Sequence, residues 1–400
     1  MEHTMQLQQP LPQADFTGKT GEEILAARRK IAAAHMRKMG EFFWRAEEDV
    51  VYTLRNDILP EESDPGHKLA IRAGRLYQGV PYSFAGSTDA AFLDYAGESD
   101  EQGVLKVGGL HWKALSGTGR QSARVGNDCS SAVMQAWSRI GNSYRVTSTL
   151  YMVRDRGYLP VGNYASPADQ YDSNRQVCRE NGEQTMFEAY ACLQLADGLV
   201  CREGGAGHAL MAVSVDVVRA ADGTIDGDAS IIHYMEQSRA HLMAEEKYFH
   251  PERQEDVYIT FGLDLKQTFR EAFAEGYLPI TCRELVDPAP AEVPTVWDSV
   301  EQPGVDTLTE GVISSNWPID RVDMTITNGD GKTVQHGAVY ALRDSRRYAL
   351  ELRQFAEEEP ERMWGRIAPE ELAAGSYRCV LTCRLTTGQV FTVRDFAFVR

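Results

Sequence analysis

The sequence predicts an α+β protein that is divided into three parts along the chain. A long pattern of apolar residues at helical spacing follows Thr20. Residues 66–286 mix helical patterns with alternating strand patterns, and residues 295–400 contain only short alternating runs. A chain of 400 residues is too long for one ordinary core, so separate folding units are expected.

The first part, residues 1–65, is predicted to be a loose tail followed by a helical extension. Residues 1–18 are polar and contain two prolines, which is typical of a tail without regular structure. Thr20 and Glu23 have the spacing of a capping box, and apolar residues then recur at helical spacing to about Leu54. We expect this helix to pack against the central domain.

The central domain, residues 66–286, is predicted to combine short helices with a small antiparallel sheet. Helical patterns end near Gly79, begin at Cys129, and recur within residues 142–200 and 265–276. Strand patterns occupy residues 208–218, 229–238 and 257–261. A glycine-rich insert at residues 88–125 has no phosphate-loop pattern, and its position before Asp128 favours a role in shaping a site.

The C-terminal part follows a boundary segment, residues 287–294, which contains three prolines. Alternating runs at residues 321–327, 376–382 and 389–393 predict strands, and residues 328–331 have the composition of a hairpin turn. The pattern predicts an all-β sandwich that resembles an immunoglobulin-like module. It holds no set of chemically reactive residues, so an accessory role is expected.

Charge and composition exclude several classes of protein. The net charge is −17, and so acidic a chain binds nucleic acid poorly and is repelled by anionic membrane surfaces. No apolar run approaches the ~20 residues of a membrane span. The N-terminus lacks both a basic region and an apolar stretch, so no signal peptide is predicted.

The chain contains seven cysteines, and neither disulfides nor a metal site is expected among them. The odd number and the missing signal peptide favour free thiols over a disulfide framework. No Cys-x-x-Cys pair occurs, and His233 and His241 lack companions at ligand spacing. We therefore predict no metal and no other cofactor.

Cys129 is the candidate nucleophile. A Gly-Asn-Asp loop ends at Asp128, and an apolar helical pattern begins directly after it. Cys129 would lie in the first turn of a buried helix, where outward N–H groups and the helix dipole favour the reactive thiolate. The alternative is that Cys129 is merely a small buried apolar residue.

His208 is the candidate partner of this thiol. It follows a glycine-rich turn, residues 204–207, and precedes the strongly apolar strand pattern of residues 209–215. A cysteine that begins a helix and a histidine that begins a central strand suit cysteine nucleophile chemistry, because the imidazole takes the thiol proton and a third polar group holds the ring. A lone histidine would more often be structural, but the pair favours catalysis.

The third catalytic residue is sought on the strand that follows. In an antiparallel pair the start of one strand faces the end of the next, so His208 faces Glu236 and Gln237 better than it faces His233. Alternation places Glu236 and Gln237 on opposite faces, so only one of them can serve. The two rank equally, and His233 ranks third.

These elements together resemble the NlpC-type cysteine peptidases, a papain-like family that cuts bacterial cell-wall peptides. The resemblance covers roughly residues 70–285 and consists of four motifs in the family's order. They are the Pro-Tyr loop at residues 81–86, Asp128-Cys129-Ser130, Gly207-His208, and a polar residue among His233, Glu236 and Gln237. The chain departs from the family in the long insert before Asp128 and in Ser131, where many members have glycine.

The resemblance implies a papain-like fold and a subsite in which Tyr82, Asp128 and Ser130 bind the free amino end of a short peptide. A carboxylate and two hydroxyls can hold an ammonium group. The alternative is that Tyr82 is an ordinary turn aromatic and that Asp128 and Ser130 only cap the helix. The backbone N–H of Cys129 would stabilise the oxyanion.

The resemblance also implies a substrate, a peptidoglycan stem peptide or another small peptide, which is cut through an acyl-thioester on Cys129. One alternative is an amidase or an acyl or amide transferase that uses the same residues. Another is a degenerate peptidase that binds wall fragments through the sandwich. A wall hydrolase should be exported, yet no signal is predicted, so the sequence leaves the location of the protein open.

Overall fold

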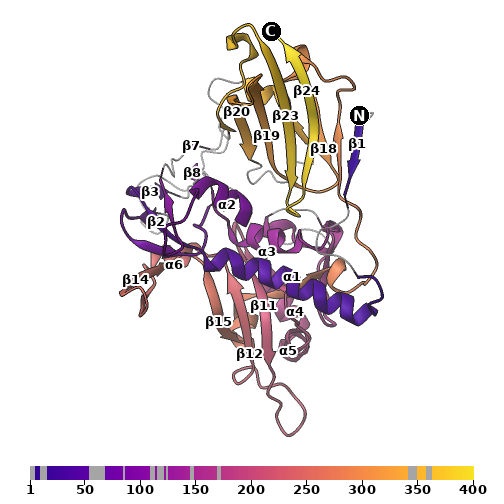
Figure 1. Ribbon diagram of the computed structural model, residues 1–400. Helices are drawn as coiled ribbons and strands as arrows, with labels where there is room; N and C mark the ends of the chain where they lie inside the picture. The colour runs from indigo at the N-terminus through magenta and orange to yellow at the C-terminus, as the bar shows by residue number, and fades with distance from the viewer. Residues whose placement is uncertain are drawn as a thin grey trace.

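The computed structural model describes residues 5–9, 16–53, 68–83, 86–108, 113–114, 121–122, 125–144, 148–168, 173–340, 349–356 and 363–400. Within these residues the protein has a mixed α+β fold, which confirms the predicted fold class at this level. Two large apolar clusters, one within residues 32–285 and one within residues 296–398, form separate cores (Figure 1). None of the described helices is long and apolar enough to cross a membrane.

Helix α1 (Gly21–Glu41) begins where the sequence predicts. The Thr20 hydroxyl accepts a hydrogen bond from the Glu23 N–H at 3.3 Å, and the Glu23 carboxylate accepts one from the Thr20 N–H at 2.8 Å. The predicted continuation to Leu54 is wrong. Aromatic residues follow Glu41 and favour extended backbone, and strands β2 (Phe43–Ala46) and β3 (Val50–Thr53) form there instead.

The predicted helix before Gly79 is also wrong, because this segment forms strands. Strand β4 (Lys68–Ile71) pairs with β3, and β5 (Leu76–Gln78) lies inside a five-stranded sheet of order β13-β14-β5-β2-β6. The other strands of that sheet are β6 (Val104–Val107), β13 (Lys247–His250) and β14 (Glu255–Ile259). Strand β5 is only three residues long, and its pairing with β14, far along the chain, determines that it is extended and not helical.

Residues 5–9 of the predicted loose tail are ordered by strand pairing, whereas residues 1–4 and 10–15 lie outside the described residues. Strand β1 (Met5–Gln8) pairs antiparallel with β17 (Thr295–Asp298) at the start of the C-terminal part. The Gln9 side chain also donates a hydrogen bond to the Val390 carbonyl at 3.2 Å. Figure 1 shows the N-terminus beside the C-terminal sheets.

A six-stranded sheet of order β15-β12-β11-β10-β16-β9 lies at the centre of the larger core, and its neighbouring strands are antiparallel. Its strands are β9 (Tyr158–Pro160), β10 (Gly198–Glu203), β11 (Ala206–Asp216), β12 (Ile231–Glu236), β15 (Gly262–Thr268) and β16 (Leu278–Cys282). Strands β11 and β12 confirm two predicted strands. The helix predicted at residues 265–276 begins later, because β15 extends to Thr268, whose hydroxyl caps helix α7 (Phe269–Glu275).

Helix α3 (Cys129–Trp137) is buried along its whole length, packs against β11, and is covered by α1 (Figure 1). The remaining α-helices are α2 (Asp89–Ala96), α4 (Asn174–Asn181), α5 (Glu183–Ala191) and α6 (Arg239–Met243). Short 3-10 helices are η2 (Thr149–Tyr151), η3 (Arg154–Arg156), η4 (Arg283–Leu285), η5 (Val305–Thr307), η6 (Leu352–Ala356) and η7 (Pro369–Glu371). Strands β7 (Lys113–Ala114) and β8 (Gln121–Ser122) pair within the insert.

The C-terminal part contains a four-stranded sheet of order β1-β17-β18-β21 and a five-stranded sheet of order β22-β20-β19-β23-β24. The strands are β18 (Val312–Ser315), β19 (Ile319–Asn328), β20 (Thr333–Tyr340), β21 (Ala349–Glu351), β22 (Met363–Trp364), β23 (Ser376–Leu385) and β24 (Val390–Val399). They confirm the three predicted strands. A buried ion pair joins the sheets, because Nε of Arg394 on β24 lies 2.6 Å from the carboxylate of Asp298 on β17.

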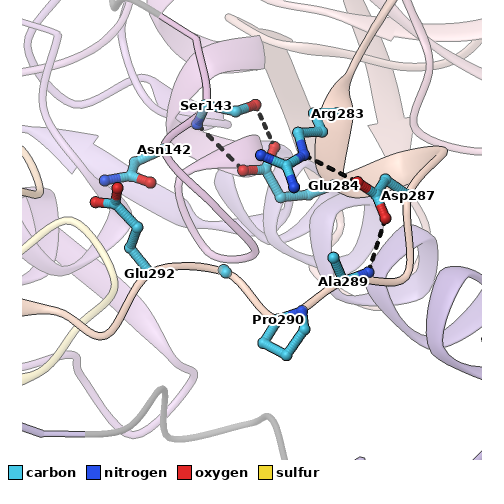
Figure 2. Close-up of a pocket in the computed structure, with 9 residues that line it drawn as sticks. Asn142, Ser143, Arg283, Glu284, Asp287, Ala289, Pro290 and Glu292 are labelled. Carbon is cyan, nitrogen blue, oxygen red and sulfur yellow. Dashed lines mark hydrogen bonds and ion pairs between the residues drawn. The ribbon is translucent and has the colours of Figure 1, made fainter.

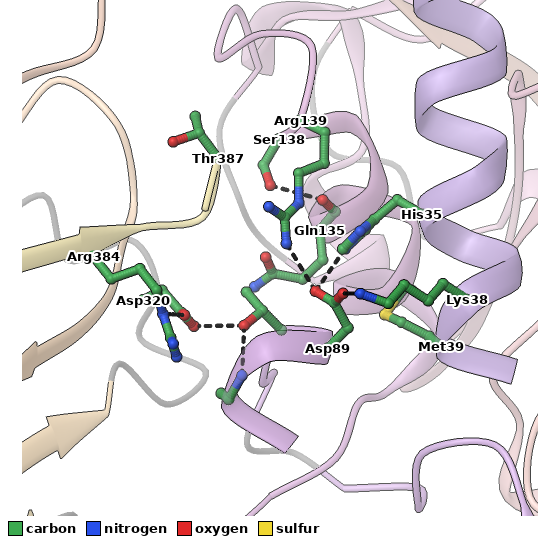
Figure 3. A network of polar contacts seen from close by, with 12 residues as sticks. His35, Lys38, Met39, Asp89, Gln135, Ser138, Arg139, Asp320, Arg384 and Thr387 are labelled. Atoms are coloured by element: carbon green, nitrogen blue, oxygen red, sulfur yellow. Dashed lines mark hydrogen bonds and ion pairs between the residues drawn. The ribbon is translucent and has the colours of Figure 1, made fainter. Parts of the chain in front are cut away.

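Polar contacts join the C-terminal part to α2 and its cap (Figure 3). The Thr88 hydroxyl, which also caps α2, donates a hydrogen bond to the Asp320 carboxylate at 2.9 Å. The Arg384 guanidinium lies 2.6 Å from Asp320 and 2.6 Å from Asp94. The C-terminal part is therefore fixed against the central domain by buried charge as well as by apolar packing.

A second group of charges surrounds Asp89 in the same region (Figure 3). Its carboxylate lies 2.7 Å from Lys38, 2.8 Å from Arg139 and 3.6 Å from His35. Burial alone would raise the pKa of Asp89, but interactions with these neighbours, among them the Arg139 and Lys38 cations, outweigh it and bring the pKa to about 2. Burial lowers the pKa of His35 to about 3, so this imidazole is neutral in the folded protein.

Candidate active site

Cys129 is the first residue of α3, as the sequence predicts, and only 7% of its surface is exposed. Asp128 caps the helix, because its Oδ1 accepts hydrogen bonds from the Ser131 N–H at 2.8 Å and from the Ser130 hydroxyl at 3.1 Å. The Ser131 hydroxyl in turn accepts a hydrogen bond from the Asp128 N–H at 2.9 Å. This closed set of contacts fixes the turn that carries the thiol.

The loop before α3 brings Tyr82 to the same place. The Asn127 N–H donates to the Pro81 carbonyl at 3.1 Å, and Tyr82 forms an isolated parallel bridge with Asn127. Gly126 has a φ of +123°, and a Cβ there would lie 2.2 Å from the Pro81 oxygen, so only glycine fits. Tyr82, Asp128 and Ser130 thus gather at the start of α3, whereas residues 84–85 of the Pro-Tyr loop lie outside the described residues.

His208 lies near the start of β11, opposite Cys201 on β10. A Cβ on the preceding Gly207 would lie 2.2 Å from the Thr149 hydroxyl oxygen, so the glycine allows η2 to approach the strand. The His208 ring makes an edge contact with Tyr277, and their centroids are 6.5 Å apart. The pairing with β10 and the close approach of η2 thus fix the backbone at His208, and Tyr277 contacts the ring itself.

Glu236 is the candidate that contacts His208. Its Oε2 lies 2.6 Å from Nε2 of the imidazole. Because Met211 pairs with Met235, Glu236 lies nearly opposite Leu210, on the face of the sheet to which His208 also belongs. The structure thus brings together Cys129, His208 and Glu236, in the order that the sequence interpretation required.

The electrostatics of this group favour a charged histidine and a charged carboxylate. Burial alone would lower the pKa of His208, but interactions with the side chains of Cys129 and Glu236 outweigh it and raise the pKa well above 6.5. Burial alone would raise the pKa of Glu236, but interactions with His208 and His241 bring it to about 2. An imidazolium next to a thiol stabilises the thiolate, so the group can activate Cys129 for attack on a carbonyl carbon.

The other two candidates for the third residue have different partners. The buried Gln237 donates a hydrogen bond to the Val80 carbonyl at 2.7 Å, directly before the Pro81-Tyr82 loop. Nε2 of His233 lies 2.8 Å from the Asp216 carboxylate. His233 pairs with Ser214, which is six residues and about 20 Å along β11 from His208.

Two residues near the group were missed by the sequence reasoning, which considered His241 only as a metal ligand and did not consider Glu246. Nε2 of His241, on α6, lies 3.3 Å from Oε1 of Glu236, and its Nδ1 lies 2.8 Å from Glu246. The available signal was a histidine shortly after the strand that carries Glu236, followed by a carboxylate. Among the described residues, no group of three or more His, Cys, Asp or Glu side chains is placed to hold a metal ion.

A cavity of about 320 Å³ lies at the boundary segment, between residues 142–143 and 283–292 (Figure 2). Its polar groups satisfy one another: the Ser143 hydroxyl donates to Glu284 at 2.6 Å, and Nε of Arg283 donates to Asp287 at 3.0 Å. No residue predicted from the sequence as part of a site lines this cavity.

Comparisons with known proteins assign no function to this chain, so a functional proposal rests on the geometry of the candidate site. The chain matches no protein-family model, and the searches of curated proteins and of solved structures also found no match.

Proposed function

We propose that the protein is a cysteine peptidase in which Cys129 is the nucleophile, His208 the general base and acid, and Glu236 the residue that orients His208. The observation that carries this proposal is the 2.6 Å contact between Oε2 of Glu236 and Nε2 of His208. It fixes the plane of the imidazole and leaves Nδ1 to interact with Cys129. A half-buried imidazole beside a buried thiol and a buried carboxylate is the arrangement that this chemistry needs.

The proposed reaction proceeds through an acyl-thioester. The Cys129 thiolate adds to the carbonyl carbon, and the backbone N–H of Cys129 stabilises the oxyanion. The tetrahedral intermediate collapses when the imidazolium of His208 gives its proton to the leaving amine. His208 then takes a proton from water, the resulting hydroxide attacks the thioester, and the acid product leaves as the thiol is restored.

The proposed substrate is a peptidoglycan stem peptide, held by its free amino end. Asp128, Ser130 and Tyr82 lie beside the nucleophile, and all three are buried. Asp128 caps α3 through Oδ1, and a carboxylate accepts hydrogen bonds through both of its oxygens. Capping and recognition are therefore compatible roles for this residue.

The proposed architecture is a papain-like domain at residues 66–286, preceded by the N-terminal extension of residues 1–65 and followed by an immunoglobulin-like sandwich at residues 295–400. The support for it is the helix that begins at Cys129 and packs on a mainly antiparallel sheet whose strands carry His208 and Glu236. The separate apolar cluster within residues 296–398 supports the sandwich as an accessory unit.

The test is digestion of purified muropeptides and short stem peptides, with products identified by mass spectrometry. We expect the wild-type protein and Cys192→Ala, which alters an exposed cysteine, to cleave, and Cys129→Ala to be inactive. The product masses name the bond. If wild type cleaves none of them although Cys129 is reactive, the peptidase proposal fails and an amidase or acyl transferase takes its place. If Cys129 is also unreactive, the binding-module interpretation replaces catalysis.

A further inference from the structure

A chain of four side chains leads from the imidazole of His208 to the protein surface. Glu236 uses both carboxylate oxygens: Oε2 lies 2.6 Å from His208, and Oε1 lies 3.3 Å from Nε2 of His241. Nδ1 of His241 then lies 2.8 Å from Oε2 of Glu246. The side chain of His241 is 5% exposed and that of Glu246 is 45% exposed, so the chain ends at solvent.

The fold makes room for His241 beside Glu236. Gly262 on β15 is paired directly with Glu236 on β12. A Cβ at Gly262 would lie 2.8 Å from Nε2 of His241, closer than real contacts allow. The imidazole thus occupies the space that the missing side chain of Gly262 leaves open over the sheet.

The contacts of His241 determine its charge. Each of its ring nitrogens faces a carboxylate oxygen, and a neutral imidazole would turn a lone pair toward one of them. Burial alone would lower the pKa of His241, but interactions with Glu236 and Glu246 outweigh it and raise the pKa. The Nε2 contact is an ion pair without the alignment of a hydrogen bond, and Nε2 has no hydrogen-bond partner among the described residues.

We infer that His241, anchored by Glu246, is a positioning residue that keeps Glu236 ionised and directed at His208. The inference rests on the proposed role of His208 and Glu236 in activating Cys129. A buried carboxylate with one oxygen unpaired would rotate away or take up a proton, and either change weakens its hold on the imidazolium. His241 supplies the second partner that prevents both.

The test is the rate at which iodoacetamide alkylates Cys129 at pH 7, resolved from the other cysteines by peptide mass spectrometry. This rate reports thiolate activation without requiring a substrate. We expect His241→Leu to slow the reaction about tenfold, and His241→Gln, which keeps a polar side chain beside Glu236 but loses the positive charge, to recover only part of the rate. His336→Gln is the matched control, because His336 pairs with Asp323 at 3.1 Å on the C-terminal sheet and should leave the rate unchanged.

A double-mutant cycle separates positioning from general destabilisation. If His241 acts through Glu236, the double variant Glu236→Gln/His241→Leu is no slower than Glu236→Gln alone. If the two substitutions slow the alkylation of Cys129 independently, so that their effects multiply in the double variant, the inference is overturned. An unchanged or faster alkylation rate in His241→Leu would also overturn it. If His241→Leu does not fold, Glu246→Ala decides in the same cycle, with an expected slowing of about threefold that also vanishes in the Glu236→Gln background.

The alkylation cycle and the muropeptide digestion test the role of His241 and the proposed function separately. Absence of muropeptide cleavage together with a coupled alkylation cycle would reject the peptidase and retain the role of His241. Cleavage that depends on Cys129 together with independent effects in the cycle would reject the role of His241 and retain the peptidase.

Discussion

The Trp317 indole N–H donates a hydrogen bond to the Ser138 carbonyl, 3.0 Å away, at the end of the helix that begins at Cys129. Trp317 belongs to the C-terminal part and is fully buried. The helix that carries the candidate nucleophile is therefore held at one end by its cap at Asp128 and at the other by the C-terminal part. This contact, with the Thr88–Asp320 hydrogen bond and the Arg384–Asp94 ion pair, makes the C-terminal part a structural support for the candidate site.

Removing the Arg384 cation, which lies beside Asp320 in the C-terminal part and beside Asp94 on α2, should destabilise the protein. We expect Arg384→Met to lower the free energy of unfolding by about 3 kcal/mol, because it removes the cation beside the buried Asp320 carboxylate. Urea denaturation measures the change. The matched control is Arg378→Met, which breaks an exposed pair with Asp395 and should cost at most about 1 kcal/mol. Equal losses of unfolding free energy in the two variants would show that the buried Arg384 pairs stabilise the protein no more than the exposed Arg378 pair does.

Stability should fall as the pH drops below about 6.5, through His35. The folded pKa of His35 is about 3, below its ordinary value of 6.5, so the unfolded chain binds a proton that the folded protein excludes. Between pH 7.5 and 5 this group removes about 2 kcal/mol from the free energy of unfolding. Urea denaturation at both pH values should show a smaller difference in His35→Gln than in wild type. In the control His336→Gln, which alters an exposed histidine, the free energy of unfolding should differ between the two pH values as much as in wild type. A difference in His35→Gln as large as that in wild type would refute the prediction.

A methyl group at Gly207 should disturb the position of His208. In Gly207→Ala the new Cβ would meet the Thr149 hydroxyl oxygen at 2.2 Å, and relief of that clash moves either η2 or His208. We expect Cys129 to be alkylated about tenfold more slowly, because small displacements of reacting groups are costly. Thr149→Gly in the same chain should restore part of the rate. Gly205→Ala, where a Cβ meets nothing within 4 Å, is the control.

The identity of the third residue can be decided by comparing Glu236→Gln with His233→Gln. The amide of Glu236→Gln keeps the shape but removes the charge that stabilises imidazolium, so kcat/KM should fall about 10²-fold on a cleaved peptide. His233 is paired with Asp216 about 20 Å along the strand, so its replacement should change kcat/KM little. A larger loss in His233→Gln than in Glu236→Gln would show that the contact with His208 is not the catalytic one.

Local patterns in the sequence predicted the parts of the fold that local chemistry decides. The capping box at Thr20, the helix that begins at Cys129 and the strand that begins near His208 all depend on neighbouring residues, and all three are found. The segments after Glu41 and before Gly79 could not be predicted, because pairing with distant strands overrides their helical spacing.

The candidate site was predictable in outline only. Antiparallel pairing favoured Glu236 and Gln237 over His233, but the choice between the two faces depends on the register of β12 against β11. The place of His241 after the Glu236 strand could be noticed in the sequence, but its contact with Glu236 could not be predicted, because that contact depends on the short helix α6 and on the space above Gly262. Sequence spacing reveals neither.

The most direct test of the account is the order in which the seven cysteines react with limiting iodoacetamide at pH 7. Exposure alone would favour Cys192, whereas Cys129 is buried. If His208 and Glu236 activate Cys129, it is alkylated first, and this preference disappears in His208→Ala. If Cys192 reacts first and Cys129 reacts as slowly as the buried Cys178 and Cys282, Cys129 is not an activated nucleophile and the central claim is wrong.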